Sequence, residues 1–197
     1  MSTEECFCIG NRNKHVVRVP IAIANELFGI LNMDAVFDIV KQIHGDMEAG
    51  DEDQAEDAEE LKVEDLEYSD RVLDVVQEYA LLPPIDRTSN IPRPLTQDLK
   101  SVVSAAAMDL VTAAEKNDYL VDLLNCSMFL RCDQLTALCA AYMAMRIDEI
   151  AKGAPDIMAG AQRIRDFMHM ENEWTPEEMV YLREEMNYAK SVDPNVY

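Results

Sequence analysis

Several features that mark large functional classes are missing from this sequence. Only 17 of its 197 residues are Lys or Arg, against 38 Asp or Glu, so the formal net charge is −21 at pH 7. A chain this acidic repels phosphate backbones and anionic lipid, and we expect neither nucleic acid nor membrane among its partners. No apolar run reaches the roughly eighteen residues that a bilayer span needs. The first residues carry Glu where a secretory signal carries Lys or Arg, which predicts a cytoplasmic and nuclear location.

Cysteine and histidine are few and scattered. The five cysteines form no CxxC pair and lie in segments that read as buried strand or helix: Cys6, Cys8, Cys126, Cys132 and Cys139. The three histidines lie far from them in sequence, without the spacing of zinc ligands. We therefore expect reduced cysteines that fill the core, and no metal. The sequence also lacks GxGxxG, P-loop and G-x-S-x-G motifs, so we predict no catalytic residue, no cofactor and no enzymatic activity.

The remaining content is that of one globular domain with an extension. Hydrophobic residues make up 49% of the chain, enough for one substantial core. Residues 5–19 place two short apolar runs around the turn formers at 10–13, which predicts a β-hairpin. Helical spacing of apolar residues predicts two short helices over 21–43, another over 72–79, and three more segments over 99–147. The predicted fold class is therefore α/β, rich in helix.

The most acidic segment spans residues 46–67. It holds twelve carboxylates and one lysine, and this self-repulsion predicts a mobile surface loop. Calcium binding and attraction of a basic partner are the functional alternatives. The D-x-D-x-D-G calcium loop is absent, because Gly50 precedes the acidic triplet instead of following it. A second break is expected at 83–94, where the density of proline predicts an extended linker.

The C-terminal segment has the strongest local signal. Thr175 and Glu178 fit a capping box, and Pro176 stands at the first helical position, where its missing N–H costs nothing. Apolar residues then recur at three- and four-residue spacing on one face, which we expect two tyrosines to flank: Met179, Leu182 and Met186, with Tyr181 and Tyr188. Nine of the twelve methionines lie from Met108 onward, which favours an adaptable binding surface in this half. Packing on the preceding helices is the alternative.

Several motifs occur in an order that points to one known family. Arg87-Thr88 and Ile91-Pro92 form an R-T-x-x-I-P linker. Three further segments, residues 7–24, 72–80 and 119–147, follow the pattern of the same family without gaps. The most specific set is in the tail: Ile164-Arg165, Asn172, Glu173-Trp174, the run T-P-E-E at 175–178, and Arg183. In this pattern the chain resembles the S-phase kinase-associated protein family. Members of that family are adaptors that join F-box proteins to a cullin in SCF-type ubiquitin ligases.

The resemblance implies a BTB/POZ-type domain over residues 1–150, an F-box-binding helical extension over 151–190, and a flexible tail over 191–197. In the family, the added helices hold the F-box, a small helical motif, in the helix-in-groove mode. Carried over position by position, the groove consists of Leu135, Cys139, Met143, Ile147, Ile164, Met168, Met170, Trp174, Leu182, Met186 and Tyr188.

Three positions depart from the family pattern. Tyr188 stands where the family has Trp, which keeps an aromatic anchor but adds a hydroxyl. Met128 and Phe129 replace an Asn-Tyr pair on the cullin-facing side, which removes an amide and a hydroxyl. The resemblance implies an adaptor with a cullin as second partner, and this pair favours the alternative of an F-box-binding assembly protein in a non-ligase complex. Self-association through the BTB/POZ face is left open.

Overall fold

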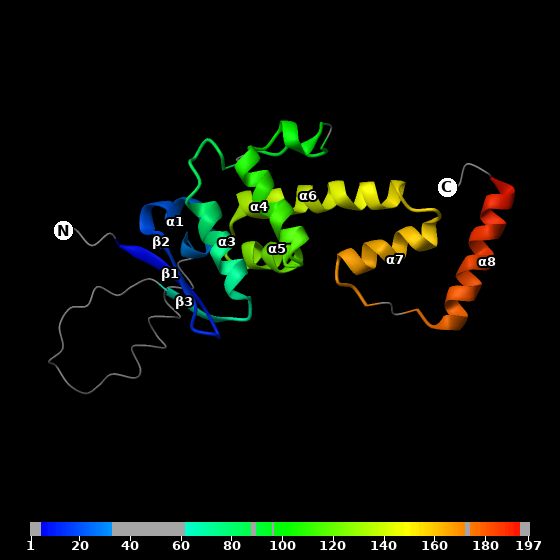
Figure 1. Ribbon diagram of the computed structural model, residues 1–197, viewed down its shortest axis with the longest axis horizontal. Helices are drawn as coiled ribbons and strands as arrows, with labels where there is room; N and C mark the ends of the chain where they lie inside the picture. Colours follow the sequence, from blue (N-terminus) through cyan, green and yellow to red (C-terminus); the bar gives the residue numbers. More distant parts are fainter. Residues whose placement is uncertain (1–4, 33–61, 88–89, 96, 172–173, 194–197) are drawn as a thin grey trace. The chain divides into compact units, whose positions relative to one another are not determined.

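The computed structural model describes residues 5–32, 62–87, 90–95, 97–171 and 174–193 (Figure 1). Within these residues the fold is α+β, with seven α-helices and one three-stranded sheet, which confirms the predicted helix-rich α/β class. The chain divides into two compact units, residues 1–142 and 143–197.

The sheet of the first unit has the order β2-β1-β3. Strands β1 (Cys6–Asn11) and β2 (Val16–Pro20) form the predicted antiparallel hairpin, with Gly10 opposite Val16. Strand β3 (Lys62–Leu66) pairs in parallel with β1, with Cys8 opposite Lys62. This strand corrects the predicted loop over 46–67. Its charged side chains are exposed on an edge strand, where solvent accommodates them, while Leu66 is buried. Residues 46–61 lie outside the described residues.

Helix α1 (Ile21–Leu27) follows β2 directly and continues into the 3₁₀ turn η1 (Gly29–Asn32). Phe28, between them, is fully buried and lies 5.8 Å from Phe7 of β1, measured between ring centroids. The pair of Phe7 and Phe28 joins α1 to the sheet. The second helix predicted up to residue 43 lies outside the described residues.

Helix α3 (Asp70–Ala80) contacts the sheet with one apolar side, and Val72, Val76 and Tyr79 are almost fully buried. The predicted helix over 72–79 is thus confirmed. The segment 83–94 is not extended throughout, because the backbone amides of Asp86 and Arg87 both donate to the carbonyl of Pro83 and close a turn. Proline density indicated a break in helix, but Pro83 also supplies the carbonyl that closes this turn.

The remaining helices of the first unit are the 3₁₀ turn η2 (Leu99–Ser101), α4 (Ala105–Lys116), α5 (Leu120–Phe129) and the first half of α6 (Asp133–Lys152). Ser104 caps α4 by accepting a hydrogen bond from the amide of Ala107 at 3.1 Å. The hydroxyls of Ser127 and Thr136 lie 2.9 Å apart and join the end of α5 to the start of α6. The contact between Ser127 and Thr136 therefore holds the end of α5 in place.

All five cysteines are free thiols. Cys8, Cys126, Cys132 and Cys139 are buried, which confirms their predicted place in the core, and Cys6 is half-buried. Burial raises the pKa of Cys126 and of Cys139 to about 12, and that of Cys132 to about 11. The three thiols are therefore uncharged packing groups at neutral pH.

The second unit comprises the end of α6, α7 (Ile157–Phe167) and α8 (Pro176–Val192) (Figure 1). Helix α6 continues through the unit boundary, and its run of buried residues ends at Met143. The buried part of α6 thus ends next to the boundary between the two units. Residues 191 and 192, expected in a flexible tail, belong to the last turn of α8. The segment 194–197 lies outside the described residues.

Candidate partner-binding surface

The second unit buries few of its residues and leaves several large apolar side chains exposed. Of the seventeen residues of α8, all of them described, none is buried, and α7 buries Gly160 alone. The large apolar side chains that stay exposed in this unit are Met170, Trp174, Val180, Tyr181, Tyr188 and Val192, with 48% to 72% of their surface accessible. Exposed apolar surface of this kind marks interaction sites in soluble proteins. The second unit is therefore the candidate site.

The start of α8 is fixed by the predicted capping box, which the structure confirms. The hydroxyl of Thr175 accepts from the amide of Glu178 at 3.3 Å, and the Glu178 carboxylate accepts from the amide of Thr175 at 2.8 Å. The bond from this backbone amide, followed by the one from the Thr175 hydroxyl, lowers the pKa of Glu178. Two otherwise unpaired amides of the first turn are thus satisfied, and the helix begins at Pro176.

Helix α8 has two apolar faces. Successive residues turn by about 100°, so Met179, Leu182 and Met186 lie within about 60° of one another. All three are half-buried. Tyr188 follows Met186 by two residues, and it therefore points about 160° away, to the opposite side of the helix. The expectation that the two tyrosines flank the methionine face is wrong: Tyr181 and Tyr188 are exposed on the far side, at 65% and 72%.

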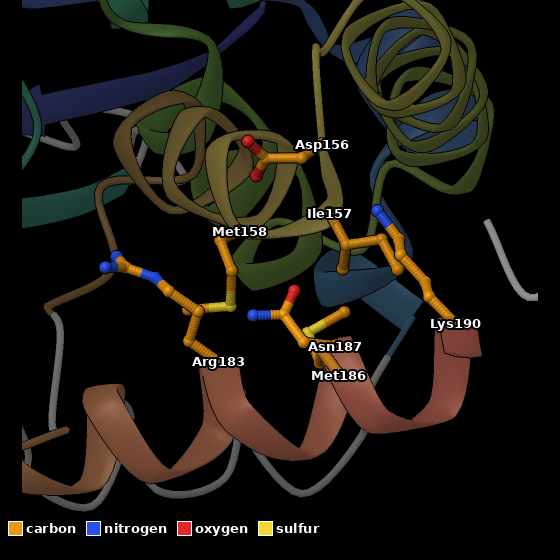
Figure 2. Close-up of a pocket in the computed structure, with 7 residues that line it drawn as sticks. All are labelled: Asp156, Ile157, Met158, Arg183, Met186, Asn187 and Lys190. Atoms are coloured by element: carbon orange, nitrogen blue, oxygen red, sulfur yellow. The ribbon is translucent and has the colours of Figure 1, made fainter. Parts of the chain in front are cut away.

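A groove lies beside the methionine face of α8. It has a volume of about 240 Å³, and its lining comes from the start of α7 and from α8: Asp156, Ile157, Met158, Arg183, Met186, Asn187 and Lys190. Figure 2 shows the side chains of Met158, from α7, and Met186, from α8, reaching into this gap, with Arg183 and Lys190 on either side. The groove is small for a cofactor. Its chemistry suits an apolar side chain with an acidic group next to it.

The eleven residues predicted for the groove fall into three groups. Leu135, Cys139 and Met143 are buried and have no surface to offer a partner in this structure. Five are half-buried: Ile147, Ile164, Met168, Leu182 and Met186. Met170, Trp174 and Tyr188 are exposed. Of the whole set, Met186 lines the groove of Figure 2. In this structure, the eight predicted residues from Ile147 onward therefore have surface available for contact with a partner.

Sequence reasoning missed part of this surface. Ile157 and Met158 line the groove, and Arg183 and Lys190 supply its positive charge, but none of the four was among the predicted binding residues. One signal was available. The two basic residues of α8 are seven positions apart, which places both on the side of Met179 and Met186.

Met128 and Phe129 lie in the last turn of α5, in the first unit, and are 58% and 47% exposed. Ser127 and Leu130 on either side of them are fully buried, which anchors the turn. The backbone is also held, because the amide of Ile30 donates to the carbonyl of Leu130 at 3.3 Å. The pair thus forms a small apolar patch on a fixed backbone.

No group of three or more His, Cys, Asp or Glu side chains arranged to hold a metal ion is found among the described residues. A second groove, in the first unit, is lined by residues 90–93, Asp133, Gln134 and Ala137. Among the helices that the structure describes, none has the length and apolarity to cross a membrane.

In comparisons with known proteins, no family model and no curated protein matches the sequence.

Proposed function

We propose that this protein is a non-enzymatic adaptor, which binds F-box proteins through its C-terminal helices and links them to a cullin in an SCF-type ubiquitin ligase. The observation that carries the proposal is α8, a capped helix that leaves apolar side chains on two faces and buries none of its residues. A helix of this kind is suited to helix-in-groove recognition. The motif order around Thr175 supplies the identity of the partner through the resemblance.

The proposal includes a BTB/POZ-type arrangement for the first unit and a location in cytoplasm and nucleus. Ubiquitin transfer would be the chemistry of other subunits. Trp174 and Met170, both exposed just before α8, would serve with Leu182 and Met186 as anchors for the F-box. Aromatic and apolar anchors of this size supply most of the binding free energy in typical interfaces.

A second function is favoured by Met128 and Phe129. If the cullin contact requires the polar pair that the family has, this apolar patch does not support it, and the protein would hold F-box proteins in a non-ligase assembly. Both side chains are about half exposed, so a cullin bound at this surface would contact them directly.

Affinity purification of the tagged full chain under native conditions separates these functions. Recovery of F-box proteins with a cullin supports the ligase adaptor, and F-box proteins without a cullin support the assembly protein. If neither class is recovered, both proposals fail.

A binding assay with purified F-box domain tests the surface itself. Trp174→Ala with Leu182→Ala is expected to weaken binding by about ten-fold or more, since truncating an anchor costs at least 1–2 kcal/mol. Leu81→Ala is the matched control, because Leu81 is 52% exposed in the first unit and lies outside the proposed surface. Unchanged far-UV circular dichroism would show that both variants fold. Equal binding by both variants would remove the C-terminal helices from the F-box site.

A further inference from the structure

The face of α8 opposite the methionines carries a second apolar stripe. Tyr181, Tyr188 and Val192 lie within about 60° of one another around the helix axis, and we call them the tyrosine stripe. They are 65%, 72% and 68% exposed. The stripe points away from Met186, so a partner bound only in the groove of Figure 2 leaves it uncovered.

Charge is segregated on α8 in the same way as its apolar residues. Glu177, Glu184 and Glu185 all lie within about 60° of Tyr188, one turn before or after a tyrosine. The two basic residues of the helix, Arg183 and Lys190, lie more than about 120° away from Tyr188. All three glutamates are exposed, and the ion pairs found among the described residues include none of them. The tyrosine stripe is therefore an apolar surface within a field of one sign.

We propose that the tyrosine stripe docks an amphipathic protein segment whose apolar side chains are flanked by Lys or Arg. Its apolar residues would cover Tyr181 and Tyr188, and its cations would pair with the glutamates. An uncharged partner would desolvate these carboxylates without compensation, which is costly. Complementary charge removes that cost and accelerates encounter. This partner is additional to the F-box proposed above, and the inference rests on α8 alone.

Other occupants fit the stripe less well. A second copy of this chain would bring glutamates against glutamates, and each copy has a net charge of −21. Helices that lie on anionic membranes carry Lys and Arg beside their apolar face, whereas this face carries acid. Charge complementarity therefore selects a basic protein segment.

The test uses the full chain and three labelled synthetic peptides, followed by fluorescence anisotropy. The first peptide has Leu at helical spacing with flanking Lys, the second replaces Lys with Glu, and the third keeps Lys but replaces Leu with Ser. We expect the first peptide to bind at least about ten-fold more tightly than either of the others, because both the anchors and the charges are needed.

Variants of α8 localise the binding. Tyr181→Ser with Tyr188→Ser, and separately Glu184→Lys with Glu185→Lys, should each weaken binding of the first peptide by about ten-fold. Glu5→Lys with Asp109→Lys makes the same change in net charge on exposed positions of the first unit and is expected to change binding by less than about three-fold. Glu184→Lys with Glu185→Lys changes none of the eleven residues predicted for the F-box groove, Tyr188 included, so F-box capture and binding of the first peptide are separate results for this variant.

Four outcomes would overturn the inference. The third peptide could bind as well as the first, which would reduce the effect to bulk charge. The control variant could weaken binding as much as the α8 variants. Sedimentation could show a dimer, or anionic vesicles could be bound, in a manner that Tyr188→Ser abolishes, which would assign the stripe to a second copy or to a membrane.

Discussion

The side-chain amide of Asn11 donates to the carboxylate of Asp70 at 2.7 Å, and this bond joins the end of β1 to the first turn of α3. Asn11 also donates to the carbonyl of Tyr68 at 3.0 Å, and its side-chain oxygen accepts from the amides of Asn13 and His15. The residue is 5% exposed. A single buried side chain thus holds both the hairpin turn and the start of a helix 59 positions later.

Replacing this residue should destabilise the first unit. Asn11→Ala leaves the Tyr68 carbonyl and two turn amides without their partner, and we expect the free energy of unfolding to fall by about 2 kcal/mol. Urea unfolding followed by circular dichroism measures this change. Asn13→Ala is the control, because Asn13 is exposed and donates to Asp70 at 3.3 Å only. A larger effect from Asn13→Ala would contradict the assignment.

The capping box predicts a pH dependence for α8. The pKa of Glu178 is lowered in the folded chain by its bonds to Thr175, so the cap stabilises the helix above the unfolded-state pKa. That contribution is lost as the pH falls through the lowered pKa of the folded chain. The amide resonance of Thr175 should therefore shift in acid with the titration of Glu178. Glu178→Gln should abolish this shift and Glu177→Gln should keep it, and a shift that persists in the first variant would refute the cap.

The buried thiols predict a reactivity pattern. Because burial raises the pKa of Cys126, Cys132 and Cys139 to between about 11 and about 12, almost no thiolate is present at pH 8. Iodoacetamide should leave these three unmodified in the folded chain and modify all five cysteines in urea, as measured by peptide mass spectrometry. Labelling of Cys126 at the same rate in both conditions would show that the α5–α6 core is open.

The apolar pair Met128 and Phe129 can be tested by substitution. Met128→Asn with Phe129→Tyr introduces an amide and a hydroxyl at exposed positions, so we expect little change in stability. If the apolar pair blocks cullin binding, the double variant should recover a cullin in native purification where the unaltered chain does not. Recovery of the cullin by the unaltered chain at the same level would show that these polar groups are dispensable.

Local patterns predicted local structure well. The alternation before and after residues 10–13 predicted the hairpin, and the positions of Thr175, Pro176 and Glu178 predicted the first turn of α8, because neighbours in sequence make these contacts. Strand β3 was missed since its stabilising partner, β1, lies more than fifty residues earlier. Charge density at 62–66 gave no sign of that pairing.

The binding surface was harder to predict than the fold. Leu135 and Cys139 have the same helical spacing as Ile147, but the first two are buried and Ile147 is half-exposed. A core and a partner both require an apolar face, so spacing cannot distinguish them. The opposite orientation of Tyr188 and Met186, by contrast, could have been predicted from the sequence alone, because successive residues of a helix are rotated by about 100°.

The capping box at Thr175 has a consequence for how α8 is met by other molecules. Because the capping box fixes the residue at which the helix begins, it also fixes the direction in which each side chain of α8 points before a partner binds. A disordered tail of the same sequence would lose conformational entropy while binding and would bind more weakly for that reason. In α8 this entropy is lost during folding. Partners are then distinguished by the face of the preformed helix to which they bind.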